Sequence, residues 1–432
     1  MNTLRVGVTG AGYVGLTTAV CLAERGHDTV CVDVDAGRVE QLRSGVPLLD
    51  EPGLAELLRR GLNSATLEFT VEYPDLAECD VVFICVPTPS RSDGSADLSA
   101  VDAAVEQLAT VLRPGSVLVL KSTVPVGTTR RIEKRLRHAG IRAVSNPEFL
   151  RESHAVYDFR NPDRIVIGAD DDEAAELVSH VHGNHAQIFR MSPESAELAK
   201  YASNAFLAVK ISYANSLARL CARMGADIAD VTRCMGADVR IGPHFLQPGP
   251  GWGGSCLPKD TAAILHTGKV AGVDLPEVES ARSTNAAQSA RIASTLGRFM
   301  ATPLGHARIT ALGLTFKAGT SDLRDSPALT ICADLGRTGA QVTGYDPRLR
   351  AMDQSRLRES SIVAVDDPYL AAKDADAIVV LTEWPEFREL DWVLIAEHAP
   401  GAVVVDTRNL LDAALLNEAG MTYLGNGTPS GY

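Results

Sequence analysis

The stretch that decides the fold class of this chain is Leu4-Arg5-Val6-Gly7-Val8-Thr9-Gly10-Ala11-Gly12-Tyr13-Val14-Gly15. Its first half is an apolar run that predicts a buried strand, and its glycines predict a tight turn into a helix. Such glycines let a pyrophosphate approach the backbone, where the helix N-terminus offers amide groups and a positive dipole end. Asp33 closes the next predicted strand, at the place where a carboxylate binds the ribose of a dinucleotide. We therefore predict a dinucleotide site.

Asp33 also indicates which dinucleotide binds. Its carboxylate repels a 2′-phosphate, so NAD is favoured over NADP as the cofactor. Arg38 lies close by in the sequence and would soften this preference by attracting the same phosphate. The alternative interpretation of these residues is a plain glycine turn followed by a solvated aspartate.

The residues around this site alternate short apolar runs with helical stretches. The runs are continuous rather than alternating, which is typical of a parallel sheet covered on both faces. The predicted strands are Leu4–Thr9, Thr29–Asp33, Val81–Val86, Val117–Lys121 and Ile165–Gly168. Residues 1–190 are therefore predicted to form a doubly wound, Rossmann-type α/β domain.

The middle of the chain has a different pattern. Pro193–Met224 shows helical spacing, with Ser192 as a good N-cap and Pro193 as a good first residue, and more helix follows at Pro276–Met300. Residues 191–302 are predicted to form a central all-α domain of the long-helix type that often mediates dimers.

Strand signals return in the last part of the chain. The predicted strands are Arg308–Leu314, Gln341–Tyr345, Ala377–Leu381 and Val403–Asp406. Residues 303–432 are therefore predicted to form a second, Rossmann-like α/β domain, although it has no glycine fingerprint. The small-residue tail Gly425–Tyr432 is expected to fray.

The composition limits the classes of function. The 432 residues carry a formal net charge of −13, whereas nucleic-acid binding needs basic surface, so no nucleic-acid partner is expected. The first residues resemble a strand rather than a signal peptide, and no apolar run approaches the ~18 residues of a membrane span. The eight cysteines include no CxxC pair, so no metal site is predicted. A cytoplasmic protein without a membrane partner is expected.

A second motif, Gly251-Trp252-Gly253-Gly254-Ser255-Cys256-Leu257-Pro258-Lys259-Asp260, carries a candidate nucleophile. Its glycines bring the loop close to something bulky, and Pro258 suits the first turn of a helix. Cys256 then stands just before the helix N-terminus, where the dipole stabilises its thiolate and Lys259 adds positive charge. A structural cysteine in a tight loop is the alternative interpretation.

Together with this loop, three further segments resemble the UDP-glucose/GDP-mannose dehydrogenase family. They are Ser145-Asn146-Pro147-Glu148-Phe149-Leu150-Arg151-Glu152, Glu197-Leu198-Ala199-Lys200-Tyr201-Ala202-Ser203-Asn204-Ala205-Phe206 and Arg240-Ile241-Gly242-Pro243. The likeness runs nearly end to end, through Gly313-Leu314-Thr315-Phe316-Lys317 to Val405-Asp406-Thr407-Arg408.

The resemblance implies a four-electron oxidation of a nucleotide sugar at C6, with two NAD⁺ as hydride acceptors. Cys256 would attack the intermediate aldehyde to give a thiohemiacetal, a second hydride transfer would give a thioester, and water would release the uronic acid. A thiol suits this route because thiolate is available near neutral pH and thioesters hydrolyse readily. UDP-glucose is the favoured substrate.

Further catalytic roles follow from the resemblance. Lys200 and Asn204 lie one turn apart on a predicted helix and share a face, for which an exposed polar stripe is the alternative. The resemblance makes Lys200 a stabiliser of oxyanions and Asn204 the holder of a water. Asp260 would orient Lys200 or a water. Glu148 and Glu152 are also spaced to share one helical face, and Glu152 would be the base of thioester hydrolysis.

Binding roles are implied in the same way. Besides the glycine stretch, Asp33 and Arg38, the expected cofactor-binding residues are Thr88, Ser122, Thr123, Glu152, Lys259 and Arg324. The expected substrate-binding residues are Glu148, Phe149, Leu150, Lys200, Asn204, Arg240, Leu246, Gly249, Gly253, Lys317 and Arg408. Thr123 ends a predicted strand and would hold the catalytic water network, unless it only forms a turn. Arg240 would reach into a second copy, so a homodimer or higher homo-oligomer is expected.

Several alternatives stay open. Leu257 is found in the GDP-mannose branch of the family, whereas Pro248-Gly249-Pro250-Gly251-Trp252 is more like the UDP-glucose branch, so TDP-glucose and GDP-mannose are reserve substrates. A two-electron hydroxy-acid dehydrogenase would not need Cys256. An inactive NAD-binding module would lack at least one of Cys256, Lys200, Asn204 and Asp260, and all are present. The group that takes the alcohol proton and the pathway of the product are not decided.

Overall fold

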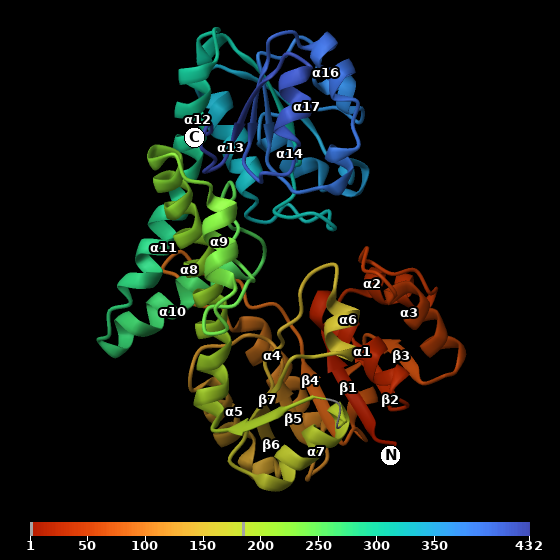
Figure 1. Ribbon diagram of the computed structural model, residues 1–432. Coiled ribbons are helices and arrows are strands. Elements are labelled where there is room, and N and C mark those ends of the chain that lie inside the picture. The colour runs from red at the N-terminus through yellow and green to blue at the C-terminus, as the bar shows by residue number, and fades with distance from the viewer. Residues whose placement is uncertain (1–2, 184–185) are drawn as a thin grey trace. The chain divides into compact units, whose positions relative to one another are not determined.

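The computed structural model describes residues 3–183 and 186–432, which fold into two compact units (Figure 1). Unit 1 comprises Met1–Ser203 with Ala262–Val273, and unit 2 comprises Asn204–Thr261 with Asp274–Tyr432. Two helices, α8 (Pro193–Met224) and α10 (Leu257–Ala271), contribute residues to both units. The division into three domains stays a prediction.

Unit 1 is built on an eight-stranded sheet in the order β3-β2-β1-β4-β5-β6-β7-β8. Its strands are β1 (Arg5–Thr9), β2 (Asp28–Val32), β3 (Leu67–Thr70), β4 (Val81–Ile84), β5 (Val117–Leu120), β6 (Arg142–Ser145), β7 (Ile165–Gly168) and β8 (Ile188–Met191). Its other helices are α1 (Tyr13–Glu24), α2 (Ala36–Arg43), α3 (Leu54–Asn63), η1 (Tyr73–Leu76), α4 (Ser99–Val111), α5 (Thr128–Leu136), η2 (Arg137–Ala139), α6 (Ala155–Arg160) and α7 (Asp172–His182).

The expected doubly wound fold is confirmed, but the sheet is mixed and larger than predicted. In the sheet order, each pair of neighbouring strands from β3 through β2, β1, β4 and β5 to β6 is parallel. Strand β7 runs antiparallel to β6. The prediction omits β3, β6 and β8 because each short run contains a charged residue, namely Glu68, Arg142 and Arg190. An apolar run also carries no sign of strand direction, so the reversal at β7 could not be predicted.

Both faces of this sheet are covered by helices, which explains its continuous apolar strands. One core joins the sheet to α1, α3, α6 and α7, and the other joins it to α4 and α5. The centre of β1 is so crowded that a Cβ on Gly7 would lie 2.8 Å from Leu76 and 2.9 Å from Val82. The strand that leads to the glycine turn is therefore fixed in position by tight packing.

Unit 2 contains a six-stranded parallel sheet in the order β11-β10-β9-β12-β13-β14. Its strands are β9 (Arg308–Leu312), β10 (Gln341–Tyr345), β11 (Val363–Ala364), β12 (Ala377–Val380), β13 (Val403–Asp406) and β14 (Thr422–Gly425). Its other helices are α9 (Ile228–Gly236), α11 (Pro276–Ala286), α12 (Gln288–Phe299), η3 (Leu304–His306), α13 (Pro327–Arg337), η4 (Leu349–Ala351), α14 (Gln354–Glu359), α15 (Pro368–Ala371), η5 (Pro385–Arg388), α16 (Trp392–His398) and α17 (Ala413–Glu418).

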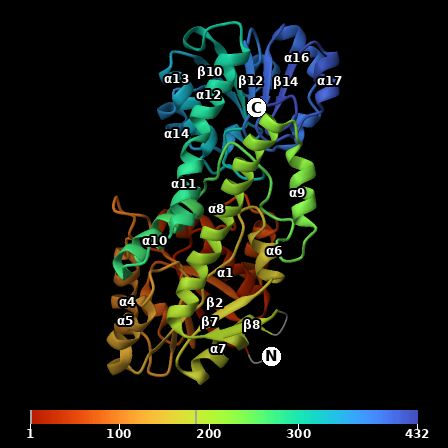
Figure 2. The ribbon, with the colours of Figure 1, turned by 60° about the vertical axis from the view of Figure 1, so that its left-hand side comes forward.

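The second sheet confirms the expected Rossmann-like α/β region. Figure 2 shows its strands between α12–α14 on one side and α16 and α17 on the other, each side with its own hydrophobic core. The helical stretch predicted at Pro276–Met300 is divided into α11 and α12 at Ala287. Just before this break, the side chain of Asn285 is bonded to the backbone of a neighbouring loop rather than to solvent.

The first β–α turn has the same construction in both sheets. Gly10 leaves β1 with φ +89° and Gly313 leaves β9 with φ +90°. The next backbone N–H then donates to the aspartate that follows the neighbouring strand, to Asp33 at 2.7 Å and to Asp346 at 2.8 Å. In unit 2 the indole N–H of Trp384 also donates to Asp346 at 3.1 Å, and Asp346 is fully buried.

The C-terminal tail is ordered, so the expectation that it frays is wrong. Tyr432 is buried, and the guanidinium of Arg291 on α12 lies 4.9 Å from its ring and donates to its backbone oxygen at 2.8 Å. Gly431 allows the chain to return this closely, because a Cβ there would lie 1.9 Å from the Gly425 oxygen. The small residues of the tail serve close packing here rather than flexibility.

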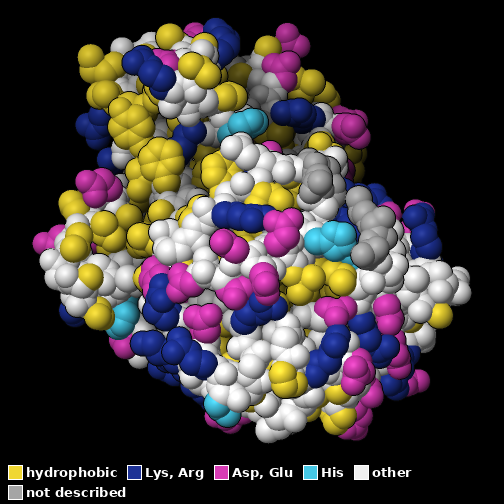
Figure 3. Space-filling view, turned by 90° about the horizontal axis from the view of Figure 1, so that it is seen from below, with side chains coloured by type: hydrophobic (Ala, Val, Ile, Leu, Met, Phe, Trp, Pro, Cys, Tyr) yellow, Lys and Arg dark blue, Asp and Glu magenta, His cyan; other side chains and the backbone are white. Residues whose placement is uncertain are grey.

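Two further properties of the structure concern membrane insertion and surface charge. None of the helices in the described residues combines the length and the apolar character needed to cross a bilayer. On the face shown in Figure 3, acidic and basic side chains are intermixed. Partly exposed ion pairs of the chain include Arg130 with Asp170 and Arg142 with Asp171.

Helix α8 has the predicted bounds, and it supplies a cap for a second helix of unit 1. Ser192 accepts from the Ser195 N–H at 3.2 Å, as an N-cap does. The carboxylate of Glu197 accepts from Gly127 N at 2.6 Å, Thr129 N at 2.7 Å and Thr129 Oγ1 at 2.6 Å. Because α5 has no side-chain cap of its own, Glu197 satisfies the amides at its start.

We predict that Glu197→Ala lowers the free energy of unfolding by about 3 kcal/mol, since several buried donors would lose their acceptor. Urea unfolding followed by circular dichroism measures this change. The exposed Glu40→Ala, on α2, is the control and should change stability by less than about 0.5 kcal/mol. Equal unfolding midpoints for the two variants would contradict the capping role.

Candidate active site

The glycine turn of unit 1 leaves room for a ligand. Gly10 has φ +89°, and a Cβ on Gly15 would lie 1.7 Å from the Gly10 oxygen, so neither position accepts a side chain. A Cβ on Gly12, in contrast, would meet no protein atom within 4 Å. Gly12 caps α1, which starts with Tyr13 and Val14 and whose N-terminus attracts phosphate. The open space at Gly12 is what a bound pyrophosphate requires.

Asp33 stands directly after β2 and is bound through both carboxylate oxygens. Its Oδ2 accepts from Ala11 N at 2.7 Å and from Arg38 Nη1 at 3.1 Å, and its Oδ1 accepts from Asp35 N at 3.0 Å. These bonds hold the carboxylate beside the glycine turn, where a ribose hydroxyl would be expected. Part of the Arg38 charge is therefore neutralised by Asp33 itself.

The ends of β4 and β5 bring further expected residues together. Thr88 donates to the backbone oxygen of Thr123 at 2.9 Å, and Ser122 donates to a backbone oxygen of the segment after β4 at 2.6 Å. Beside them, Lys121 is almost fully buried and donates to Asn146 Oδ1 at 3.2 Å. Burial lowers the pKa of Lys121. The C-terminal edge of this sheet therefore gathers polar groups, as in other doubly wound folds.

Glu148 and Lys200 form a buried ion pair within unit 1. The distance between Glu148 Oε1 and Lys200 Nζ is 3.2 Å, and their side chains are 8% and 4% exposed. Burial alone would raise the pKa of Glu148, but Lys200 and the Leu150 N–H, which donates to its other oxygen at 2.6 Å, lower it overall. The Lys200 ammonium also lies 5.1 Å from the centre of the Phe149 ring. The pair can stabilise charge or transfer a proton.

Glu152 occupies a turn, so the expectation that it shares a helical face with Glu148 is wrong. Residues 146–154 contain no helix. Pro147 cannot donate a helical hydrogen bond, and the Leu150 N–H is bonded to the Glu148 side chain instead of a carbonyl. The residue after Glu152, Ser153, has φ +67°. A tight turn therefore presents Glu152.

In unit 2, Cys256 directly precedes α10, as predicted. Its carbonyl accepts from Asp260 N at 2.8 Å, the first hydrogen bond of this 15-residue helix. The thiol is partly exposed and its Sγ lies 3.6 Å from Ser255 Oγ. A thiol at a helix N-terminus has its thiolate stabilised by the dipole, which favours nucleophilic chemistry.

The glycines of this loop let it pack against the chain itself. A Cβ on Gly253 would lie 1.9 Å from the Asp325 oxygen, and one on Gly254 would lie 2.8 Å from the Phe316 ring. The Gly254 N–H donates to the Arg324 oxygen at 3.1 Å. Close packing thus accounts for both glycines, and the substrate contact expected of Gly253 stays a prediction.

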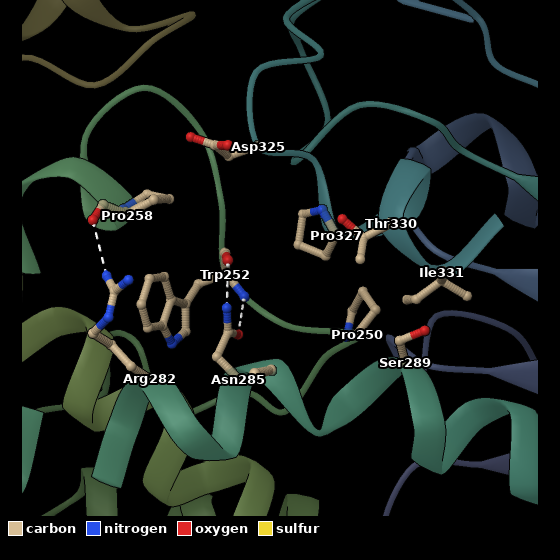
Figure 4. A pocket seen from close by; sticks show the side chains of 11 residues that line it. Pro250, Trp252, Pro258, Arg282, Asn285, Ser289, Asp325, Pro327, Thr330 and Ile331 are labelled. Atoms are coloured by element: carbon tan, nitrogen blue, oxygen red, sulfur yellow. Dashed lines mark hydrogen bonds between the residues drawn. The ribbon is translucent and has the colours of Figure 1, made fainter. Parts of the chain in front are cut away.

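Helix α11 anchors Trp252 and Pro258, which flank Cys256 in the sequence; Figure 4 shows these two contacts. The Asn285 amide accepts from Trp252 N at 2.7 Å and donates to Trp252 O at 2.9 Å. Arg282 donates to Pro258 O at 3.0 Å. These residues line a cavity of about 250 Å³ behind the loop. The position of the thiol is therefore fixed by side chains far away in the sequence.

Asp260 is fully buried and joins two residues of unit 2. Its Oδ2 accepts from Asn204 Nδ2 at 2.6 Å, and its Oδ1 lies 2.6 Å from Lys259 Nζ. These bonds fix the side chain of Asn204, and the predicted task of Asp260 in orienting Lys200 or a water stays a prediction. The Lys259 charge is shared with Asp260.

A larger cavity in unit 2, of about 660 Å³, is lined by Leu246 and Arg408, two residues expected to bind substrate. The Arg408 Nε donates to the Leu381 oxygen at 3.0 Å, and a Cβ on Gly249 would lie 3.0 Å from Arg408 Nη1. Gly249 is itself held by Asn215, whose Oδ1 accepts from its N–H at 2.8 Å. The cavity wall also holds Glu383, which lies 3.1 Å from Arg408 Nε, and two further arginines, Arg233 and Arg388. With three arginines to one glutamate, a cavity of this size suits an anionic ligand.

Three other expected binding residues have side-chain contacts with their sequence neighbours. The Lys317 ammonium, after the turn that follows β9, lies 5.9 Å from the Phe316 ring. Arg324 pairs with Asp322 at 2.6 Å. Arg240 pairs with Asp238 at 2.6 Å and has a side chain that is 85% exposed. The binding roles of these residues stay predictions.

We did not identify Glu51, Lys121 and Asn285 from the sequence as residues that build or support the site. Lys121 did have a signal, because it ends a strand at the edge where active-site side chains gather. Glu51 and Asn285 had none, since their partners Tyr13 and Trp252 lie 38 and 33 positions away in the chain. Only the folded structure brings these pairs together.

Comparison with known proteins covers most of the chain. Residues 4–186 match the NAD binding domain of the UDP-glucose/GDP-mannose dehydrogenase family, residues 194–287 its central domain, and residues 310–413 its UDP binding domain. The UDP-glucose 6-dehydrogenase of Pseudomonas aeruginosa PAO1 is 43% identical over 99% of this chain and 98% of its own length. That of Rhizobium meliloti is 42% identical over 99% and 100%. A solved UDP-glucose dehydrogenase from Pyrobaculum islandicum superposes with a TM-score of 0.89 at 36% identity, over 99% and 98% of the two chains.

Proposed function

The chain belongs to the UDP-glucose/GDP-mannose dehydrogenase family, and we propose that it oxidises the C6 alcohol of UDP-glucose to the carboxylate of UDP-glucuronate. Full-length relatives at 43% and 42% identity are named for this activity. The observation in the chain itself that carries the proposal is the Cys256 thiol at the N-terminus of α10. A dehydrogenase that stops at an aldehyde or ketone needs no such nucleophile.

The residues of unit 1 fit NAD. The open space at Gly12 would take the pyrophosphate, and Asp33 would bind a ribose and disfavour the 2′-phosphate of NADP. When bound, NAD supplies the hydride acceptor for both oxidations. Arg38 is paired with Asp33 at 3.1 Å, so it offers less attraction to a 2′-phosphate than a free arginine would. Preference for NAD follows.

The first oxidation removes a proton from the C6 hydroxyl and a hydride from C6, and leaves an aldehyde. Lys200 would stabilise the alkoxide as the proton departs, and its buried partner Glu148 keeps it charged. Asn204 stands one turn further along α8, and its bond to Asp260 fixes the direction of its amide. We assign Asn204 the role of hydrogen-bonding the reacting oxygen or an ordered water.

The second oxidation would proceed on the protein. The Cys256 thiolate adds to the aldehyde carbon, the resulting oxyanion takes up a proton, and loss of a hydride and a proton then leaves a thioester. Glu152 would remove a proton from water as the water attacks the thioester carbon. The C–S bond breaks, the carboxylate is released and the thiol is restored.

The nucleotide end of the substrate would bind in unit 2. Arg408, in the wall of the 660 Å³ cavity, is the candidate contact for the diphosphate, and Leu246 offers an apolar surface. Lys317 would add positive charge near the same edge of the sheet. We propose a cytoplasmic location because all eight cysteines are free thiols, which fits a reducing compartment.

We predict that UDP-glucose gives the highest kcat/KM in a panel with TDP-glucose, GDP-mannose and UDP-N-acetylglucosamine. Each sugar consumed should yield two NADH and no free aldehyde. NADH absorbance together with chromatography of the products measures both quantities. Robust turnover of another nucleotide sugar, with UDP-glucose at background, would refute the substrate. One NADH per sugar with aldehyde in solution would refute the four-electron route.

We predict that Cys256→Ser folds but loses steady-state turnover by roughly 10³-fold or more, as expected for a key catalytic group. A serine hydroxyl is a weaker nucleophile than a thiolate, and its ester hydrolyses more slowly than a thioester. Steady-state NADH production and thermal unfolding measure the two properties. The exposed Cys234→Ser, on α9, is the matched control and should keep normal turnover. Near-normal turnover of folded Cys256→Ser would return this residue to a structural role.

We further propose that the chain acts as a homodimer. In unit 2, one face of α8 exposes Phe206, Tyr213, Leu220 and Met224, which are 54–73% exposed and separated by seven, seven and four residues. A contiguous apolar row on a helix marks an interaction surface, and the same helix of a second copy is a complementary partner. The exposed Arg240 would then complete the partner's site.

Mixing two inactive variants tests this arrangement. Arg240→Ala and Cys256→Ala subunits, unfolded and refolded together, should regain about a quarter of the wild-type activity per subunit by random assortment into pairs. Refolding Arg240→Ala with the Arg240→Ala/Cys256→Ala double variant is the control and should regain none. Sedimentation equilibrium gives the oligomeric state of the wild-type chain. A monomer, or no regain in the mixture, would contradict the proposal.

A further inference from the structure

The turn that carries Glu152 is held in a conformation that it would not adopt by itself. Ser153 has φ +67°, in the left-handed region that non-glycine residues rarely occupy. The Ser153 Oγ is buried without a hydrogen-bond partner among the described residues. A turn with these properties persists only where surrounding contacts determine it.

Those contacts lie on both sides of Glu152. On the N-terminal side, Asp158 accepts from Arg151 N at 2.8 Å, and the Arg151 oxygen accepts from His154 N at 2.9 Å. On the C-terminal side, the Ala155 N–H donates at 2.7 Å to Oε1 of Glu51, a buried carboxylate far away in the sequence. The second contact ties the turn to a different part of unit 1.

Glu51 is in turn bound to the glycine turn of the cofactor site. Its Oε2 accepts from the hydroxyl of Tyr13 at 2.5 Å, and the same hydroxyl lies 3.2 Å from the Arg151 oxygen. Tyr13 is the first residue of α1, directly after Gly12. Burial and the bond to Glu51 raise the pKa of Tyr13 far above its usual value, so the phenol stays a donor. Tyr13 of the glycine motif therefore contacts one end of the Glu152 turn directly and the other end through Glu51.

We propose that Tyr13 and Glu51 are positioning residues that fix the Glu152 turn and thereby set the rate of thioester hydrolysis. The inference rests on the proposed function, in which Glu152 activates the attacking water. In that function the chemical role of Glu152 is in hydrolysis, so loosening the turn should slow hydrolysis more than the hydride transfers. A base displaced by about 1 Å loses much of its effect, because general-base catalysis depends on hydrogen-bond reach to the water.

Tyr13→Phe removes the hydroxyl and keeps the ring. We expect steady-state turnover to fall about tenfold, as for the loss of one well-placed hydrogen bond. The first turnover should still form two NADH per site in a rapid burst, and acid-quenched enzyme should carry a substrate-derived mass on Cys256. Without any ligand, amide hydrogen exchange at residues 151–155 should quicken about tenfold. Tyr157→Phe, whose ring is exposed on α6, is the matched control and should resemble the wild type in all three readouts.

The Glu152→Gln variant separates the proposed function from the positioning role of Tyr13. It should accumulate the same adduct and lose turnover by about 10² or more, but leave amide exchange at the turn unchanged. If Glu152→Gln accumulates the adduct and Tyr13→Phe does not, the positioning role is overturned and the proposed function stands. If Glu152→Gln shows no adduct, the assignment of Glu152 as the base fails, and the inference fails with it. Unchanged exchange in Tyr13→Phe would also overturn the positioning role.

Discussion

The structure depends on a single constraint, which is that a charge placed in the interior must have a partner there. The Glu148–Lys200 pair satisfies it in unit 1, and Asp260 satisfies it in unit 2 by binding Lys259 and Asn204. Removing one member would leave the other charge buried and alone, which is far more unfavourable than losing both. The segments that bear these residues are therefore held together by the same groups that the proposed chemistry uses.

Much of the architecture follows from local pattern. The glycine turn, the continuous strands and helix α8 were all predictable, because each depends on residues that are near neighbours in the sequence. Strands β3, β6 and β8 were not, since each has only four residues and one of the four is charged. The tail could not be predicted either, because its order comes from Arg291 and from close packing at Gly431.

The candidate site, like the fold, has some features that the sequence predicts and others that it does not. The position of Cys256 before α10 was predictable from Pro258, and the placement of Asp33 from the strand before it. The supports of these residues were not predictable, because Asn285 acts on a loop 33 positions away. The helix expected around Glu152 was a wrong prediction, because hydrogen bonds from the backbone to side chains replace helical ones there. Spacing identifies the reactive groups, and only the fold identifies what holds them.

The repeated turn in the two sheets has a consequence for the order of events. In unit 2 the indole of Trp384 is bonded to Asp346, the aspartate equivalent to Asp33, and that carboxylate is sealed from solvent. Of the two matching turns, only the first can offer its carboxylate to a dinucleotide. Both oxidations must then use the same dinucleotide site, so NADH has to leave and NAD⁺ has to enter between the two oxidations. In the proposed mechanism the sugar is bound to Cys256 through sulfur during that exchange, so the covalent bond would also keep the intermediate from leaving the site.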